Sequence, residues 1–148
     1  MLTVFDIAKN FYNRESDMSL KKLQKLCWYA YSWYIALNNE PDEENLELLF
    51  NSRAEAWIHG PVFRDLYDDF RHNDCDKLKS SNTDLNSEII YFLDEVYRVY
   101  GSYTGYQLES IAIQESPWKN ARGDLRPSQP CTNYIDEKDV FEEYLNRN

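Results

Sequence analysis

The segment 19–38 constrains the fold more than any other part of the chain, because it predicts a helix that is apolar around most of its circumference. Ser19 is a good N-cap residue, so we expect the helix to begin there. An apolar surface this wide requires neighbours on several sides, which makes this the central, aromatic-rich helix of the domain. One polar arc remains, and we expect it to face solvent. Its members are Lys21, Lys22, Lys25, Tyr29 and Ser32.

Shorter amphipathic segments predict further helices on both sides of the central one. They lie at residues 3–14, after Gly60-Pro61, from Asn82 or Asp84 to Gly101, from Thr104-x-x-Gln107 to Pro117, and after Asp136. Thr104 and Gln107 form a capping-box pattern, and Asp136 is a favourable N-cap. The polar segments 71–83 and 123–134 predict surface loops.

The sequence patterns give the least information about secondary structure in the segment 46–62. Proline is favoured at the first helical position, so we expect Pro61 to open a helix. The run Leu46-Glu47-Leu48-Leu49-Phe50 is too short for periodicity to separate a strand from a helical turn. A chain of 148 residues has the size of one domain. The expected fold is therefore mainly α, a compact single domain over residues 1–148 with about six helices and room for a small β element near residues 46–58.

The chain is strongly acidic, with a formal net charge of -10 and a pI near 4.6. Gripping phosphates requires a basic face, so direct binding of nucleic acid is not expected. An acidic surface suits a basic protein partner, and it also serves solubility alone. Both interpretations stay open on composition. Aromatic residues make up 16% of the chain, and Tyr and Trp suit both cores and protein interfaces.

The three cysteines, Cys27, Cys75 and Cys131, form no C-x-x-C pair. Neither a disulfide framework nor a zinc site is expected, and no pattern for a cofactor is present. The N-terminus has no basic region followed by an apolar run, and no apolar stretch approaches the roughly 18 residues of a membrane span. We therefore expect a cytoplasmic protein without metal, cofactor or membrane contact.

Four residues carry the side chains that suit a binding or catalytic groove: Trp57, His59, Trp118 and Arg122. A lone histidine is more often structural than catalytic, because catalysis needs a base and a nucleophile placed together. Trp118 is interpreted as a core residue, and Arg122 as a helix cap or the partner of a carboxylate. The alternative is a shared groove that these four residues line.

The Lys22-Leu23-Gln24-Lys25-Leu26 stretch has two interpretations as well. The first is a solvated face on an otherwise buried helix. The second is a small cationic patch beside Trp28 and Tyr29 that contacts a partner.

These stretches, taken in order, resemble the Panacea domain, also called the SocA-like antitoxin domain or phage-associated protein. The resemblance runs from about Ile7 to about Leu145. It rests on Lys22, Leu23, Gln24, Lys25, Leu26, Tyr29, Trp57, Gly60, Pro61, Val62, Leu66, Tyr67, Pro117, Trp118 and Arg122. It implies a small bacterial or prophage protein that neutralises a toxin encoded beside it. The candidate partner-binding or family-motif positions are Lys22, Gln24, Lys25, Tyr29, Trp57, His59, Pro61, Trp118 and Arg122.

The chain departs from the family pattern at two places. Tyr31 stands where the family often has Gln, and Ile113-Gln114-Glu115-Ser116 stands where it often has His shortly before the Pro-Trp pair. Some members carry an additional DNA-binding domain, for which this chain is too short.

The resemblance implies an antitoxin that binds its toxin directly and is not an enzyme. One alternative is a proteolytic adaptor that delivers the toxin to an ATP-dependent protease. A second alternative, from another class, is a small enzyme that uses a groove near His59 and Arg122. The sequence leaves the toxin, its target and the contact surface open.

Overall fold

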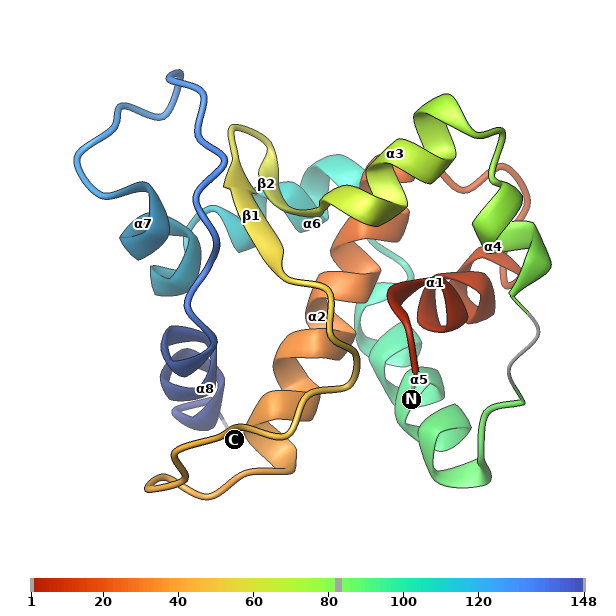
Figure 1. Cartoon of the computed structure of the whole chain (residues 1–148), viewed down its shortest axis with the longest axis horizontal. Coiled ribbons are helices and arrows are strands. Elements are labelled where there is room, and N and C mark those ends of the chain that lie inside the picture. The colour runs from red at the N-terminus through yellow and green to blue at the C-terminus, as the bar shows by residue number, and fades with distance from the viewer. Residues whose placement is uncertain (1, 82–83, 148) are drawn as a thin grey trace.

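A computed structural model of the chain describes residues 2–81 and 84–147, and it confirms a mainly helical fold with a small antiparallel sheet (Figure 1). The elements within those residues are α1 (Val4–Tyr12), α2 (Leu20–Leu37), β1 (Ala54–Trp57), β2 (Gly60–Phe63), α3 (Arg64–His72), α4 (Asp76–Ser80), α5 (Ser87–Tyr100), α6 (Gly105–Ala112), α7 (Ser116–Arg122) and α8 (Glu137–Leu145).

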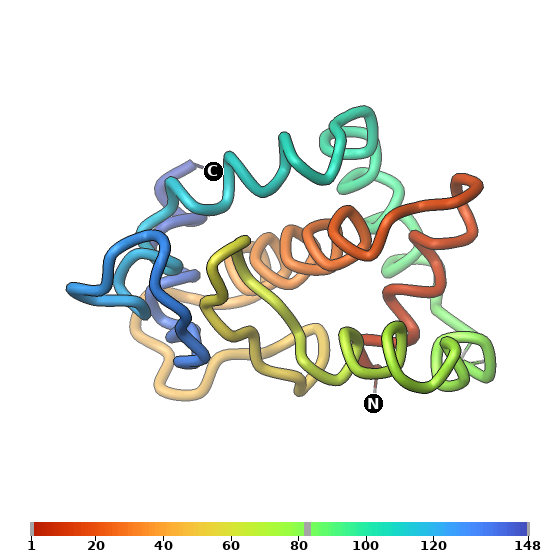
Figure 2. Tube along the Cα trace, turned by 90° about the horizontal axis from the view of Figure 1, so that it is seen from above, coloured from red at the N-terminus to blue at the C-terminus, as the bar shows by residue number. Residues whose placement is uncertain are grey.

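Helix α2 is the central element, as the width of its apolar surface predicts. Its N-cap is Ser19, whose hydroxyl accepts a hydrogen bond from the backbone N–H of Lys22 at 3.1 Å. Every residue from Lys22 to Ser32 is buried. Helices α1, α5, α6 and α8 and strand β2 all pack against α2, and Figure 2 shows the helix running through the middle of the molecule.

The polar arc of α2 does not face solvent, which corrects the expectation from the helical wheel. The exposed fractions of Lys22 and Lys25 are 9% and 2%, and Tyr29 and Ser32 are fully buried. The reason is that the β1–β2 hairpin and helix α6 cover this side of α2. Their backbone carbonyls and Gly101 O accept hydrogen bonds from the lysine and tyrosine side chains.

The segment 54–63 forms a β-hairpin, so the expectation that Pro61 opens a helix is wrong. Strands β1 and β2 pair antiparallel, with Ala56 opposite Pro61 and Trp57 opposite Gly60. Proline has no backbone N–H to donate between strands, so within sheets it occurs on edge strands. In this two-stranded sheet, β2 is an edge strand. On the other edge of β1, the backbone N–H of Ala56 donates to Asn133 O at 2.8 Å. The small β element therefore exists, although it extends beyond residue 58.

Two further expectations need correction. The predicted loop 71–83 contains helix α4, whose Leu78 side chain is buried. The Asp69 carboxylate accepts hydrogen bonds from the backbone N–H groups of Lys77 and Leu78 in this helix. Pro117 does not end α6, because that helix stops at Ala112 and Pro117 lies in the first turn of α7, where proline is favoured.

The predicted helix starts fared better. The capping box of Thr104 and Gln107 and the Asp136 cap are both confirmed. Helix α5 begins at Ser87 after its cap Asn86, so the predicted start at Asp84 is wrong; the alternative start at Asn82 lies outside the described residues.

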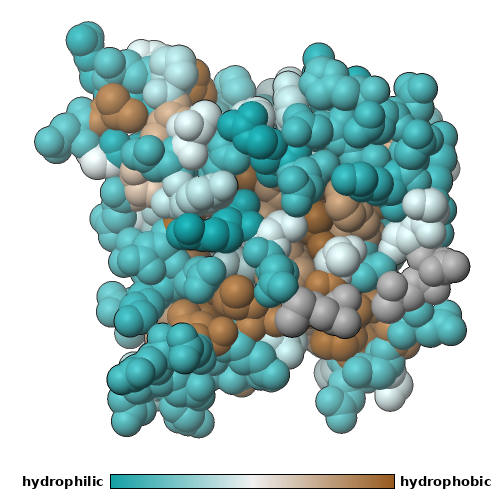
Figure 3. All heavy atoms as spheres, viewed as in Figure 1, coloured by the Kyte–Doolittle hydropathy of each residue, from teal (hydrophilic) through white to brown (hydrophobic). Residues whose placement is uncertain are grey.

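The surface of the face seen in Figure 1 is mostly hydrophilic, with hydrophobic residues exposed mainly in its lower half (Figure 3). Beneath it, the core is rich in stacked and edge-on rings. Phe50 and Phe63 meet Tyr31 with ring centroids 5.4 and 5.5 Å away. The aromatic composition thus serves the core first.

Candidate functional site

Three stretches that are far apart in the sequence meet at the β1–β2 hairpin. They are residues 22–26 on α2, the hairpin itself, and residues 117–122 on α7. Side chains from both helices bond to the backbone of the hairpin from opposite sides. These are the same stretches that carry the family resemblance, so the motif marks one connected structural unit.

Gln24 takes the place of a strand neighbour for β2. Its amide nitrogen donates to Phe63 O at 3.0 Å, and its amide oxygen accepts from Phe63 N at 2.9 Å. A single side chain therefore satisfies both backbone groups of a fully buried residue. Unsatisfied buried backbone groups destabilise a fold, so this pair holds β2 against α2.

Lys25 reaches the same strand one residue further along the helix. Its Nζ donates to Pro61 O at 3.2 Å, and the side chain is 2% exposed. Burial lowers the pKa of Lys25 to about 7; the charge of Glu109 opposes this shift and that of Lys21 adds to it. The amine of Lys25 therefore loses its proton more readily than an exposed lysine does.

Gly60 makes this close approach possible. Its φ is +102°, in the region that favours glycine, and a Cβ here would lie 2.9 Å from Cε of Lys25. The glycine is required both by the turn and by the lysine packed on it.

We expect Gly60→Ala to lower the free energy of unfolding by about 1–2 kcal/mol, from backbone strain and the displaced lysine. Urea denaturation would measure it. The matched control is Gly123→Ala at the end of α7, where φ is +60° but no atom lies within 4 Å of the added Cβ. An equal loss in both variants would contradict the role assigned to Lys25.

Lys22 and Tyr29, which lie on either side of Lys25 along α2, also bond to the backbone of neighbouring elements. Lys22 Nζ donates to Gly101 O at 2.7 Å and pairs with the Glu15 carboxylate at 2.7 Å. The Tyr29 hydroxyl donates to Leu108 O at 3.1 Å, and its ring stacks on Tyr100 with centroids 4.1 Å apart. These residues join α2 to the end of α5 and to α6.

From α7, Trp118 and Arg122 bind the first strand. Trp118 is 6% exposed, and its indole N–H donates to Trp57 O at 2.8 Å. One guanidinium nitrogen of Arg122 donates to Ala56 O at 2.9 Å. The other guanidinium nitrogen contacts the carbonyls of Arg126, Pro127 and Gln129.

The core position of Trp118 is confirmed, whereas the prediction for Arg122 is not. Arg122 neither caps its own helix nor pairs with a carboxylate, because its donors go to four backbone carbonyls. Its guanidinium also lies 4.8 Å from the ring centroid of Trp118. Arg122 therefore joins the loop after α7 to strand β1.

His59 and Trp57 lie in a different pocket from Trp118 and Arg122. The first pair lines a cavity of about 360 Å³ beside Ile58, and the second pair lines one of about 300 Å³. His59 is exposed at the hairpin turn, with Nδ1 3.4 Å from a Glu109 carboxylate oxygen. The structure thus divides the expected groove in two.

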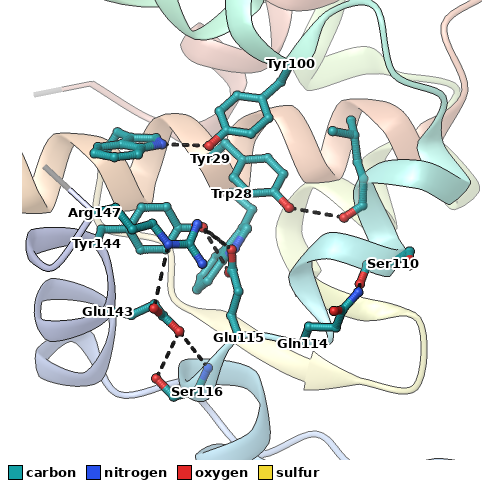
Figure 4. Close-up of polar contacts among 12 residues, drawn as sticks. Trp28, Tyr29, Tyr100, Ser110, Gln114, Glu115, Ser116, Glu143, Tyr144 and Arg147 are labelled. Carbon is teal, nitrogen blue, oxygen red and sulfur yellow. Dashed lines mark hydrogen bonds and ion pairs between the residues drawn. The ribbon is translucent and has the colours of Figure 1, made fainter.

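A buried carboxylate that the sequence did not single out lies where α2, the start of α7 and α8 meet (Figure 4). Glu115 is 2% exposed and accepts hydrogen bonds from the Tyr144 hydroxyl at 2.7 Å and from the Trp28 indole at 3.3 Å. Arg147 lies 3.2 Å from the same carboxylate. Burial raises the pKa of Glu115, although its partners act in the opposite direction.

This network attaches α8 to the rest of the domain. Glu143 accepts from the backbone N–H of Ser116 at 3.0 Å, and Arg147 lies 3.6 Å from it. The only sequence signal for the network was a carboxylate directly before Ser-Pro-Trp, in the stretch where the chain departs from the family pattern. That signal does not indicate burial.

Neither a metal cluster nor a membrane helix is found in the described parts of the chain. Within residues 2–81 and 84–147, no three His, Cys, Asp or Glu side chains are grouped to hold a metal ion. No helix in those ranges is long and apolar enough to cross a membrane.

Comparison with known proteins gives one similarity. A family model described as "Antitoxin SocA-like, Panacea domain" matches residues 23–119. The matched range begins inside α2 and ends inside α7, so it contains the hairpin and most of the side chains that bind it. Searches of the curated proteins and of the solved structures gave no match.

Proposed function

Because the chain belongs to the family of SocA-like antitoxins with a Panacea domain, we propose that it is the antitoxin of a toxin–antitoxin pair and neutralises a cognate protein toxin by binding it directly. The observation that carries this proposal is the family match, which covers two thirds of the chain. We further propose that residues 1–148 act as one domain in the cytoplasm.

The motif residues support this proposal through the fold. The hairpin backbone accepts hydrogen bonds from four motif side chains, those of Gln24, Lys25, Trp118 and Arg122. Arg122 donates to strand β1 and to the loop after α7, and it lines a different pocket from His59. The arrangement favours a rigid binding surface over the groove-based enzyme, since a catalytic group must reach its substrate.

The charge of the chain suits this role. A net charge of -10 raises the rate of encounter with a basic toxin, and exposed aromatic and aliphatic side chains supply contact once the complex has formed. Such side chains include Tyr91, Tyr106 and Leu37, which are 67%, 75% and 53% exposed.

Coexpression tests the proposal. Expressing this chain with the protein encoded by the adjacent gene should restore growth, and the two proteins should copurify without a third component. Raising the salt concentration should slow association far more than it speeds dissociation, because exposed charges are screened beyond about 8 Å at physiological ionic strength.

Two outcomes of this experiment would distinguish direct binding from the alternative functions. Rescue without any detectable complex would contradict direct binding. A complex that restores growth only in hosts with intact ATP-dependent proteases would favour the adaptor function over blocking.

A further inference from the structure

A cavity of about 300 Å³, here called the α7 pocket, lies between α7, the end of α6 and the loop that follows α7, which is seen at the upper left of Figure 1. Pockets for small molecules have volumes of roughly 300–1,000 Å³ and combine apolar walls with a few polar groups. The α7 pocket has both kinds of lining. Its walls include Ile113, Trp118, Lys119, Arg122, Leu125 and Pro127.

Arg122 brings a positive charge to this pocket without a counter-ion. The residue is 4% exposed, and within residues 2–81 and 84–147 no carboxylate forms an ion pair with it. A guanidinium keeps its charge in proteins, and burying a charge without an opposite charge is unfavourable. The four carbonyls that accept from Arg122 supply dipoles and no net charge. An anion in the α7 pocket would supply the opposite charge.

One donor of Arg122 remains free for such an anion. Among the described residues, the Nη atoms of Arg122 make its hydrogen bonds and Nε makes none. Nε is not sealed in the interior either, because Ser32 Oγ is the only sealed side-chain polar atom without a partner in that part of the chain. The Nε–H group is therefore open to solvent, on a side chain that lines the α7 pocket.

The charge around the α7 pocket is opposite to that of the whole chain. Residues 117–130 contain three basic residues, Lys119, Arg122 and Arg126, and one acidic residue, Asp124, whereas the chain carries a net charge of -10. Lys119 and Arg122 are three positions apart, so they project from the same side of α7. Neither Lys119 nor Asp124 forms an ion pair with any described residue. The local charge thus favours an anionic ligand.

We propose that the α7 pocket binds a small organic acid, a monocarboxylate with an aromatic or branched aliphatic body. The carboxylate accepts from the Nε–H group of Arg122 and from the Lys119 ammonium, and charge-assisted hydrogen bonds of this kind are stronger than neutral ones. The body packs on Ile113, Leu125 and Pro127, which inorganic phosphate could not use. This inference goes beyond the proposed function, because the ligand binds the free chain and no toxin takes part.

Three probes added to the purified chain test the chemistry of the ligand. Phenylpropionate has a carboxylate and an aromatic body, phenylpropanamide has a neutral amide in place of the carboxylate, and inorganic phosphate has no body. The reporter is the Arg122 Nε–H signal in an NMR spectrum, assigned with Arg122→Lys. We expect phenylpropionate to shift this signal and to bind at least about tenfold more tightly than the amide, since a hydrogen bond to a charged group commonly supplies that factor.

Three results with these probes would contradict the proposal. Equal binding of the acid and the amide would mean that the cavity takes apolar groups without regard to charge. Phosphate that binds as tightly as phenylpropionate at equal ionic strength would show general attraction of anions. An Arg122 signal that does not move at millimolar phenylpropionate would mean that the α7 pocket is not a site for such acids.

A matched pair of variants tests the charge inside the pocket. Leu125→Glu places a competing carboxylate in the wall, whereas Leu125→Gln has the same shape without the charge. Leu125 is 38% exposed, so both variants should fold. We expect Leu125→Glu to bind phenylpropionate at least about tenfold more weakly than Leu125→Gln. Equal affinities would contradict an interaction between the ligand and the guanidinium.

A second pair tests the contribution of Lys119. Lys119→Gln should weaken binding of phenylpropionate by about twofold to fivefold, as expected for an exposed ion pair. Lys138→Gln removes the charge of another exposed lysine, at the start of α8, and should leave the affinity unchanged. Equal losses in both variants would mean that the acid responds to the overall charge of the chain, which contradicts a site at α7.

Discussion

Trp118→Ala is expected to lower the free energy of unfolding by about 3–5 kcal/mol, the range for truncating a buried aromatic side chain. The indole is 6% exposed and supports Arg122, whose guanidinium lies 4.8 Å from its ring centroid. The variant also loses the hydrogen bond to Trp57 O. Thermal unfolding followed by circular dichroism should show a midpoint lower by roughly 10 °C or more.

Two further variants make this result specific. Trp118→Phe keeps most of the packing and loses only the hydrogen bond, so we expect a loss of about 1 kcal/mol. Tyr91→Ala removes another large ring, one that is 67% exposed, and should change stability by no more than about 0.5 kcal/mol. If Trp118→Ala melts like the wild type and fails to bind the toxin, Trp118 is an interface anchor instead of a core residue.

Lys25 should make stability depend on pH in a predictable direction. Burial lowers the pKa of Lys25 from 10.5 in the unfolded chain to about 7 in the folded protein. At pH values between these two, folding is therefore accompanied by release of a proton. A group with a depressed pKa contributes stability that is complete above the unfolded value and is lost as pH falls through the folded value. Stability should therefore decrease from pH 9 to pH 7.5, by about 2 kcal/mol for this residue alone.

The measurement is the difference in unfolding free energy between the wild type and Lys25→Met. Methionine has similar length and no charge, so other titrating groups act alike in both proteins. The wild type should lose about 2 kcal/mol relative to the variant between pH 9 and pH 7.5. Parallel pH profiles would show that the amine keeps its ordinary pKa, and hence that water reaches it.

The elements that the sequence predicted well are those determined by local chemistry. The start of α2 follows from Ser19, and the starts of α6 and α8 follow from Thr104 and Asp136. Each cap satisfies backbone groups within three residues of itself, so no knowledge of distant segments is needed.

The wrong predictions concern residues whose burial or secondary structure depends on contacts with distant segments of the chain. A helical wheel places Lys22 and Lys25 in solvent, because it cannot show that Gly101 O and Pro61 O come to meet them. Helix α4 was missed because a single buried leucine, Leu78, gives no periodicity.

The candidate site was predictable only in part. The residues of the motif were named from the sequence, but their joint task was not, because Gln24 and Phe63 are 39 positions apart. The apolar side chains of α2 and α5 indicated burial, and only the structure shows that Leu37 and Val99 remain exposed.

The way the hairpin is held has a consequence for the order of folding. A two-stranded hairpin of four-residue strands is at best marginally stable alone, and here its bonds to Gln24 and Arg122 span 39 and 66 positions. Closing such long loops is entropically unfavourable until α2 and α7 are already in place. We therefore expect the hairpin to form late, as the step that closes the domain, because a newly made chain has no complete motif until α7 has been synthesised.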